Sequence, residues 1–185
     1  MNEKQIKLER PERLEELNPT ETLRNIGLTE NHIVCDIGAG SGIFTIPAAR
    51  IGKKVYALEI SDEMLMIIRE KVNRESISNI EFIKVDDAGF DVEDKTADIA
   101  LLVTVLHGIP EKTAFLHEVK RILKDTGRLA VLEFHKRETP MGPAVERRLG
   151  KEDVIDVLKD VGLVESFYFD LGENFYCLVF EKISI

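Results

Sequence analysis

The stretch IVCDIGAGSGIF, residues 33–44, decides the fold class of this chain. A largely apolar run ends in an aspartate, and glycines then follow at every second position as Gly38, Gly40 and Gly42. An apolar run of this length is typical of a buried strand. Glycine permits positive φ and lets a ligand approach the backbone amides that begin the next helix. The stretch therefore predicts a strand, a ligand-binding turn and a helix.

Further short apolar runs rich in Val and Ile follow, and helical patterns separate most of them. The predicted strands are residues 33–37, 54–59, 80–85, 98–104, 127–134, 163–171 and 174–182, and the predicted helices are 45–51, 62–74, 111–124 and 151–161. This alternation predicts an α/β fold, a doubly wound and mostly parallel seven-stranded sheet with helices on both faces. Only Gly172 and Glu173 join the last two strands, which predicts an antiparallel C-terminal hairpin strand.

Length and composition favour one domain over residues 1–185, because 185 residues with 44% hydrophobic content fill one sizeable core. Residues 1–30 are expected to form a helical N-terminal extension, with a cap at Asn18 and Pro19 at the first helical position. The formal net charge is −9, from 25 Lys and Arg against 34 Asp and Glu, which argues against nucleic acid as a partner.

The sequence shows neither a membrane span nor a secretory signal. No apolar run reaches the roughly 20 residues of a span, and the charged N-terminus lacks the apolar core of a signal peptide. We therefore expect no membrane insertion and a cytoplasmic location. The two cysteines, Cys35 and Cys177, lie in strand-like runs without C-x-x-C spacing, so we expect buried reduced thiols and no metal site.

The glycine pattern distinguishes between two classes of ligand. The dinucleotide fingerprint G-x-G-x-x-G, started at Gly38, would need a third glycine where Ile43 stands, which argues against a dehydrogenase. The stretch reads D-x-G-x-G-x-G instead, and this pattern resembles the class I S-adenosylmethionine-dependent methyltransferases, which have a Rossmann-like fold. Residues 101–134 look most like the type 11 branch, which contains the quinone-biosynthesis C-methyltransferases.

The resemblance implies S-adenosylmethionine as the cofactor. Glu59 ends the second predicted strand, where its carboxylate can accept two hydrogen bonds from a ribose diol. Either Asp86 or Asp87 is expected to face the adenine, and Met64 alternatively packs in the core. The full set of cofactor-binding residues expected from the resemblance is Asp36, Gly38, Ala39, Gly40, Gly42, Glu59, Ile60, Met64, Asp86, Asp87, Ala88 and Thr104.

Two histidines are candidate catalytic residues. His107 and His135 follow the fourth and fifth predicted strands, and either could deprotonate an acceptor near neutral pH. The alternative for each is a polar loop residue or a packing histidine. The reaction expected from the resemblance is methyl transfer to a small-molecule acceptor. The alternative is an S-adenosylmethionine-binding subunit or regulator with little or no activity.

The segment after the fifth predicted strand reverses the sign of the charge. Residues 135–151 carry five basic and two acidic side chains, a charge of +3 in a chain of −9. We expect residues 135–150 to form a lid over an acceptor that is apolar in part and anionic in part. Arg147 or Arg148 would meet the anion, since a guanidinium matches a carboxylate or phosphate. The alternative is a solvated loop.

Overall fold

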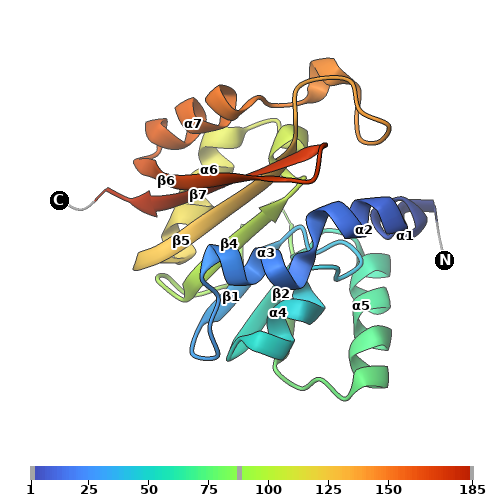
Figure 1. The fold of residues 1–185 in the computed structure, drawn as a ribbon. Helices are drawn as coiled ribbons and strands as arrows, with labels where there is room; N and C mark the ends of the chain where they lie inside the picture. The colour runs from blue at the N-terminus through green and yellow to red at the C-terminus, as the bar shows by residue number, and fades with distance from the viewer. Residues whose placement is uncertain (1–2, 87–88, 184–185) are drawn as a thin grey trace. The chain divides into compact units, whose positions relative to one another are not determined.

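A computed structural model describes residues 3–86 and 89–183, and the chain divides into two compact units, Met1–Asp91 and Val92–Ile185 (Figure 1). Two of the residues expected at the adenine, Asp87 and Ala88, lie outside the described residues. Within the described part of the chain, no helix has the length and apolar character needed to cross a membrane.

The first unit is built on three parallel strands in the order β3-β2-β1. The strands are β1 (Ile33–Ile37), β2 (Lys54–Glu59) and β3 (Ile80–Lys84), and the connecting helices are α4 (Thr45–Ile51) and α5 (Asp62–Glu75). Register pairs join Ile33 to Lys54 and Val55 to Ile80. Parallel pairing brings the carboxyl ends of β1 and β2 to the same edge, so Ile37 and Leu58 are register partners there.

Three short helices precede β1, namely α1 (Glu3–Leu8), α2 (Pro11–Leu17) and α3 (Pro19–Ile26). Pro19 begins α3 and Asn18 is its N-cap residue, as predicted, but the Asn18 side chain makes no capping hydrogen bond. Asn18 also ends α2, where its N–H bonds to the carbonyl of Leu14 and its φ of 34° is left-handed. A capping side chain needs an extended backbone, and one residue cannot adopt both conformations.

The second unit contains four strands in the order β4-β5-β7-β6. They are β4 (Ala97–Val103), β5 (Leu123–Phe134), β6 (Leu163–Leu171) and β7 (Phe175–Lys182), with helices α6 (Lys112–Ile122) and α7 (Lys151–Asp160) and 3₁₀ turns η1 (Leu106–Gly108) and η2 (Val145–Arg147). β4 and β5 are parallel, whereas β7 is antiparallel to both of its neighbours. The predicted class, a mostly parallel seven-stranded sheet with a reversed C-terminal strand, is confirmed.

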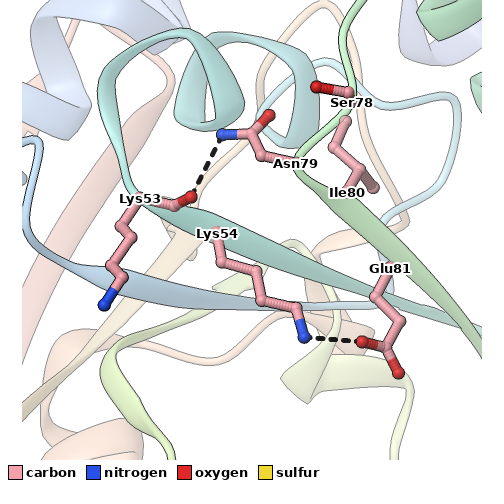
Figure 2. A pocket seen from close by; sticks show the side chains of 6 residues that line it. All are labelled: Lys53, Lys54, Ser78, Asn79, Ile80 and Glu81. Atoms are coloured by element: carbon pink, nitrogen blue, oxygen red, sulfur yellow. Dashed lines mark hydrogen bonds and ion pairs between the residues drawn. The ribbon is translucent and has the colours of Figure 1, made fainter.

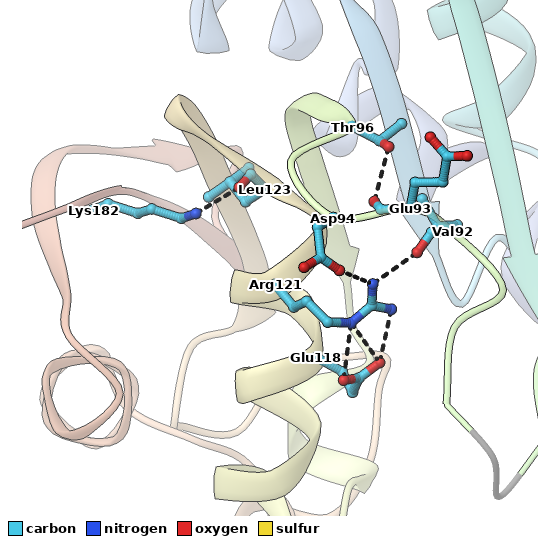
Figure 3. Close-up of polar contacts among 8 residues, drawn as sticks. All are labelled: Val92, Glu93, Asp94, Thr96, Glu118, Arg121, Leu123 and Lys182. Carbon is cyan, nitrogen blue, oxygen red and sulfur yellow. Dashed lines mark hydrogen bonds and ion pairs between the residues drawn. The ribbon is translucent and has the colours of Figure 1, made fainter.

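Helix α6 ends two residues earlier than the sequence predicted, because Leu123 already pairs with Ala97 of β4. A polar network fixes this junction (Figure 3). Arg121 binds the Glu118 carboxylate, Asp94 Oδ1 at 2.7 Å and the Val92 carbonyl at 2.8 Å. The end of α6 is thereby tied to the chain that enters β4.

Candidate functional site

The loop after β1 has the backbone that its glycines predict. Gly38, Gly40 and Gly42 all have positive φ, of 78°, 55° and 84°. The N–H groups of Gly38 and Ala39 bond to the carbonyl of Leu58 in β2, at 2.8 and 3.0 Å. Since L-residues with a side chain rarely adopt positive φ, this loop conformation favours glycine at each of the three positions.

The surroundings of Gly40 and Gly42 differ. A Cβ at Gly42 would lie 3.1 Å from Ile68 in α5, so close packing against that helix also explains this glycine. A Cβ at Gly40 would meet Leu8 of α1 at 3.0 Å, and α1 therefore lies against the loop. The positive φ of the turn thus favours glycine at all three positions, and close packing adds a second reason at Gly40 and Gly42.

Glu59 connects the end of β2 to the glycine loop. Its side chain is almost fully buried, and Oε2 accepts the Gly40 N–H at 2.8 Å. Oε1 accepts the Ser61 N–H at 3.0 Å and lies 3.7 Å from Nζ of Lys4 in α1. A carboxylate held on backbone amides in this way keeps further lone pairs for hydroxyl donors.

Asp36 is the second buried carboxylate at this edge, with only 2% of its surface exposed. Oδ2 accepts a hydrogen bond from Thr45 Oγ1 at 2.5 Å. Burial raises the pKa of Asp36 to about 6, the Thr45 hydrogen bond opposes this shift, and the negative charge of Glu59 adds to it. Asp36 and Glu59 together make the buried edge of the loop acidic and therefore suited to a cation.

The N-terminal extension is bonded to the same loop. Lys71 of α5 donates to Glu9 Oε1 at 2.6 Å and to the carbonyl of Ser41 at 2.8 Å. With Lys4 near Glu59 and Leu8 near Gly40, residues 4–9 contact the glycine loop and its carboxylate. These contacts could not be predicted from the sequence, because no local pattern signals an ion pair across 62 residues.

The other predicted residues of the first unit are placed as follows. Ile60 exposes 69% of its surface directly after Glu59, and Asp86 is exposed and bridges to Gly89. Met64 is fully buried, which fits the alternative of core packing. Ser41 Oγ, within the loop, is the one buried side-chain polar atom without a hydrogen-bond partner among the residues that the structure describes.

In the second unit, Thr104 follows β4 in a strained conformation. Its φ is 54°, and its N–H bonds to the Leu132 carbonyl of β5 at 2.7 Å. A β-branched residue with positive φ is a genuine outlier, because its Cβ substituents crowd the backbone. Strain of this kind concentrates at binding and catalytic sites, so the conformation supports Thr104 as a candidate site residue.

His107 lies in η1 and is held by a carboxylate that the sequence analysis did not single out. Glu133, near the end of β5, is 1% exposed. Its Oε1 accepts the His107 N–H at 3.1 Å, and its Oε2 lies 2.8 Å from His107 Nδ1. The available signal was a single acid within the apolar run of residues 129–134.

His135 lies beside the hairpin of β6 and β7. Its Nε2 is 3.4 Å from Asp170 Oδ1, its N–H bonds to the Asn174 carbonyl at 3.0 Å, and its ring centroid lies 5.5 Å from that of Tyr176. Burial lowers the pKa of His135, although the nearby Asp170 opposes this shift. Burial against the hairpin therefore favours the neutral form of the ring.

Arg147 and Arg148, the two predicted acceptor ligands, have different surroundings. Arg147 is exposed, whereas Arg148 is buried. The Arg148 guanidinium lies 5.2 Å from the Phe134 ring centroid. It donates to four backbone carbonyls, those of Pro143, His135, Arg137 and Met141. Arg148 thus holds the predicted lid segment together, and of the pair Arg147 presents its side chain to solvent.

A surface depression elsewhere does not resemble a cofactor site (Figure 2). It is lined by Lys53, Lys54, Ser78, Asn79, Ile80 and Glu81. It lies at the amino ends of β2 and β3, opposite the edge that carries Glu59. Lys54 pairs with Glu81 at 2.6 Å, and the Asn79 amide bonds to the carbonyls of Ala49, Gly52 and Lys53. These polar groups therefore already bind other groups of the protein.

Comparison with known proteins decides the family. The profile of the methyltransferase domain matches residues 35–131, which include the glycine loop, Glu59 and Thr104. A crystal structure of an S-adenosylmethionine-dependent methyltransferase from Aquifex aeolicus superposes with a TM-score of 0.88 at 30% identity, covering 94% of each chain. The chain belongs to the methyltransferase family. The predicted family and its cofactor, S-adenosylmethionine, are confirmed.

Curated relatives of this methyltransferase include quinone-biosynthesis enzymes. A demethylmenaquinone methyltransferase of Tropheryma whipplei is 36% identical over 109 residues, which cover 59% of this chain and 44% of the relative. A ubiquinone/menaquinone biosynthesis C-methyltransferase of a Marinomonas species is 30% identical over 125 residues, covering 65% and 49%. The methyltransferase therefore spans about half the length of these curated relatives.

The geometry of the first unit fits the cofactor of this family. S-adenosylmethionine carries a ribose diol, an ammonium group and an adenine ring. The chain offers a carboxylate at Glu59, a buried acid at Asp36 and backbone amides in a loop of three glycines with positive φ. No group of three or more side chains suited to a metal ion occurs in residues 3–86 and 89–183.

Proposed function

We propose that this chain transfers a methyl group from S-adenosylmethionine to a small-molecule acceptor. One observation carries the proposal: Glu59, at the carboxyl end of β2, is fixed by the Gly40 amide of the glycine loop. This arrangement places a hydrogen-bond acceptor and a close-approach backbone at the edge of a parallel sheet where ligands bind. The family membership supports the same assignment.

The proposed partners of the cofactor lie in the first unit, except for Thr104 in the second. Glu59 accepts the ribose hydroxyls, and the backbone of Gly38, Ala39 and Gly40 lies along the sugar and the methionine part. The ionised carboxylate of Asp36 holds the ammonium group of the cofactor. Ile60 packs on the adenine, Asp86 or Asp87 accepts its amino group, and Ala88 and Thr104 contribute backbone groups.

The protein's chemical task is modest because the cofactor supplies an activated methyl group. The side chains align the acceptor, exclude water and take up a proton when the acceptor must lose one. His107 is the residue proposed for this last step, since Glu133 engages its Nδ1 and the reactive nitrogen is then Nε2. His135 is the second candidate, and its lowered pKa favours the neutral form that a base requires.

The acceptor is proposed to be apolar in part and anionic in part. The names of the curated relatives, which act in quinone biosynthesis, support an apolar ring system. Arg147 is exposed in the basic segment of residues 135–150 and would bind the anionic part when that segment closes as a lid. The net charge of −9 disfavours nucleic acid as the acceptor, and a cytoplasmic location completes the proposal.

Calorimetry with S-adenosylmethionine, S-adenosylhomocysteine and NAD tests the cofactor assignment. We expect both sulfur ligands to bind and NAD to fail. Glu59→Ala should weaken S-adenosylmethionine binding by about 1.5–3 kcal/mol, the range for hydrogen bonds to a charged group, whereas exposed Glu81→Ala should not. Equal affinity in a folded Glu59→Ala variant would remove Glu59 from the site.

Acceptor screening with a labelled methyl donor separates the enzyme from a binding subunit. Aromatic quinol precursors with and without a carboxylate form the first panel. Label in a product at a rate above that of the same mixture without the protein supports methyl transfer. Cofactor binding without label in any product of a broad panel would favour the alternative of an S-adenosylmethionine-binding subunit or regulator.

A further inference from the structure

Glu133 is an unusual residue for its place in the fold. It occupies β5 between Leu132 and Phe134, where the strand is buried, and only 1% of its own surface is exposed. A carboxylate in such surroundings is costly unless its oxygens are hydrogen-bonded. The partners of Glu133 therefore explain why an acid is present at this position.

His107 contacts both carboxylate oxygens of Glu133. His107 donates its backbone N–H to Oε1 at 3.1 Å, and its Nδ1 lies 2.8 Å from Oε2. The two contacts fix the position of the η1 turn and the rotation of the imidazole together. Since β4 and β5 are parallel, both groups lie at the carboxyl ends of neighbouring strands.

The contact bears on the tautomer of the ring. An ionised carboxylate can only accept hydrogen bonds, so with Glu133 in that form the 2.8 Å contact puts the hydrogen of the neutral ring on Nδ1 and its lone pair on Nε2. Tyr176 is the register partner of Glu133, but its hydroxyl donates to the Leu149 carbonyl at 2.8 Å. The tyrosine hydroxyl therefore does not compete with His107 for the carboxylate of Glu133.

We infer that Glu133 is a positioning residue that holds His107 as the proton acceptor of methyl transfer, an inference that rests on the proposed function. His107 Nε2 takes the proton that the acceptor atom loses as this atom bonds to the methyl carbon and the carbon–sulfur electron pair passes to sulfur. The negative charge of Glu133 stabilises the imidazolium that results. The substrate class is therefore an acceptor with an ionisable hydrogen at or next to the methylated atom.

Glu133→Gln separates positioning from a purely structural role. The amide oxygen can still accept the His107 N–H, which leaves the NH₂ group to face Nδ1. Nδ1 must then accept, and the ring hydrogen moves to Nε2. The variant thus keeps the shape and number of hydrogen bonds while removing the lone pair from the reactive nitrogen.

The experiment combines NMR of the ring nitrogens with methyl transfer. Long-range ¹H–¹⁵N spectra identify the tautomer of His107, whose signals are assigned by their loss in His107→Asn. We expect an Nδ1–H ring in the natural protein and an Nε2–H ring in Glu133→Gln. The rate on the acceptor from the labelled-donor screen should fall about 10²-fold, with S-adenosylmethionine affinity unchanged within about twofold. Exposed Glu165→Gln is the matched control and should change neither property.

The outcomes distinguish this inference from the proposed function. A shifted tautomer with an unchanged rate would overturn the role of His107 while leaving methyl transfer intact. An Nδ1–H ring that persists in Glu133→Gln would overturn the positioning role of Glu133. If the natural protein shows no cofactor binding, the proposed function fails, and the tautomer of His107 still reports on its pairing with Glu133.

Discussion

At the scale of single residues, each compact unit holds a carboxylate where burial makes a charge costly. Asp36, Glu59 and Glu133 are each at least 96% buried at the ends of strands. Glu59 and Glu133 accept backbone N–H groups, whereas Asp36 accepts the Thr45 hydroxyl. Fixed hydrogen bonds of this kind orient a charge before a ligand arrives, which is the requirement for a preorganised site.

The pKa of Asp36 predicts how cofactor affinity depends on pH. Burial raises this pKa to about 6, so the carboxyl group is ionised at pH 8 and largely protonated at pH 5. Only the ionised form attracts the ammonium group of the cofactor. We expect calorimetry to show constant affinity above pH 7 and a decline of up to about tenfold per unit below pH 6.

Asp36→Asn provides the control for this prediction. The variant should bind S-adenosylmethionine more weakly at pH 8 and lose the decline below pH 6. Its unfolding adds a second check. A raised pKa stabilises the fold at low pH, and this contribution is lost as pH rises through about 6, so Asp36→Asn should raise the melting temperature more at pH 8 than at pH 4. The same decline in Asp36→Asn would point to another group.

The sequence predicted the residues whose identity is set by local chemistry. The glycines and the acid at the end of β2 are parts of a motif, and their backbone angles and contacts agree with it. Glu133 was missed because its hydrogen-bond partner, His107, is 26 positions away in the sequence. Arg147 or Arg148 was predicted to bind an anion because a guanidinium matches a carboxylate or phosphate, but the guanidinium of Arg148 is engaged by backbone carbonyls that no sequence pattern reveals.

At the scale of elements, the segment after β5 is a loop closed around one side chain. Arg148 donates to the carbonyls of residues on both sides of a turn, and its guanidinium lies near the ring of Phe134. Gly142 has a φ of 97°, and a Cβ there would lie 2.8 Å from Phe134. The segment is therefore an ordered loop, and any closure over an acceptor would move it as a unit.

Arg148→Met tests the importance of this clamp. We expect it to lower the free energy of unfolding by about 1.5–3 kcal/mol, because the charge-assisted hydrogen bonds are lost and their carbonyls are left unpaired. Arg147→Met, one position away and exposed, should change stability by no more than about 0.5 kcal/mol. Urea unfolding of both variants measures the difference, and equal stabilities would show that water replaces the clamp.

Element boundaries show where sequence patterns stop being informative. Helix α4 and strands β1, β2 and β6 begin and end where the periodicity predicted, because the apolar pattern of each is self-contained. Helix α6 was predicted to continue to residue 124, and its pattern allows that. Pairing of Leu123 with Ala97 ends the helix, and such long-range pairing overrides local propensity.

At the scale of the whole molecule, each compact unit contains one cysteine. Cys35 lies in β1 of the first unit and Cys177 in β7 of the second, and both are fully buried. Burial raises the pKa of Cys35 to about 12 and that of Cys177 further. Neither thiol should react with Ellman's reagent at pH 8 until its unit opens.

The reaction rates of the two thiols therefore test the prediction of a single domain. If residues 1–185 unfold as one cooperative unit, both cysteines should be labelled at the same rate at every urea concentration, as resolved by mass spectrometry of the peptides. Labelling of one thiol at lower urea would assign independent stability to the two units. Cys35→Ala and Cys177→Ala variants provide the single-site controls.

The exposed side chain that follows Glu59 makes this chain convenient for spectroscopy. The sequence contains no tryptophan, and Ile60 exposes 69% of its surface. Ile60→Trp would therefore introduce the single tryptophan of the chain, so that no other indole contributes to the fluorescence. The position is exposed, and substitutions at such positions usually change stability little. If Ile60 packs on the adenine, addition of S-adenosylhomocysteine should quench the emission of this indole through ring stacking. A titration followed by fluorescence would then yield affinities at micromolar protein without any knowledge of the acceptor.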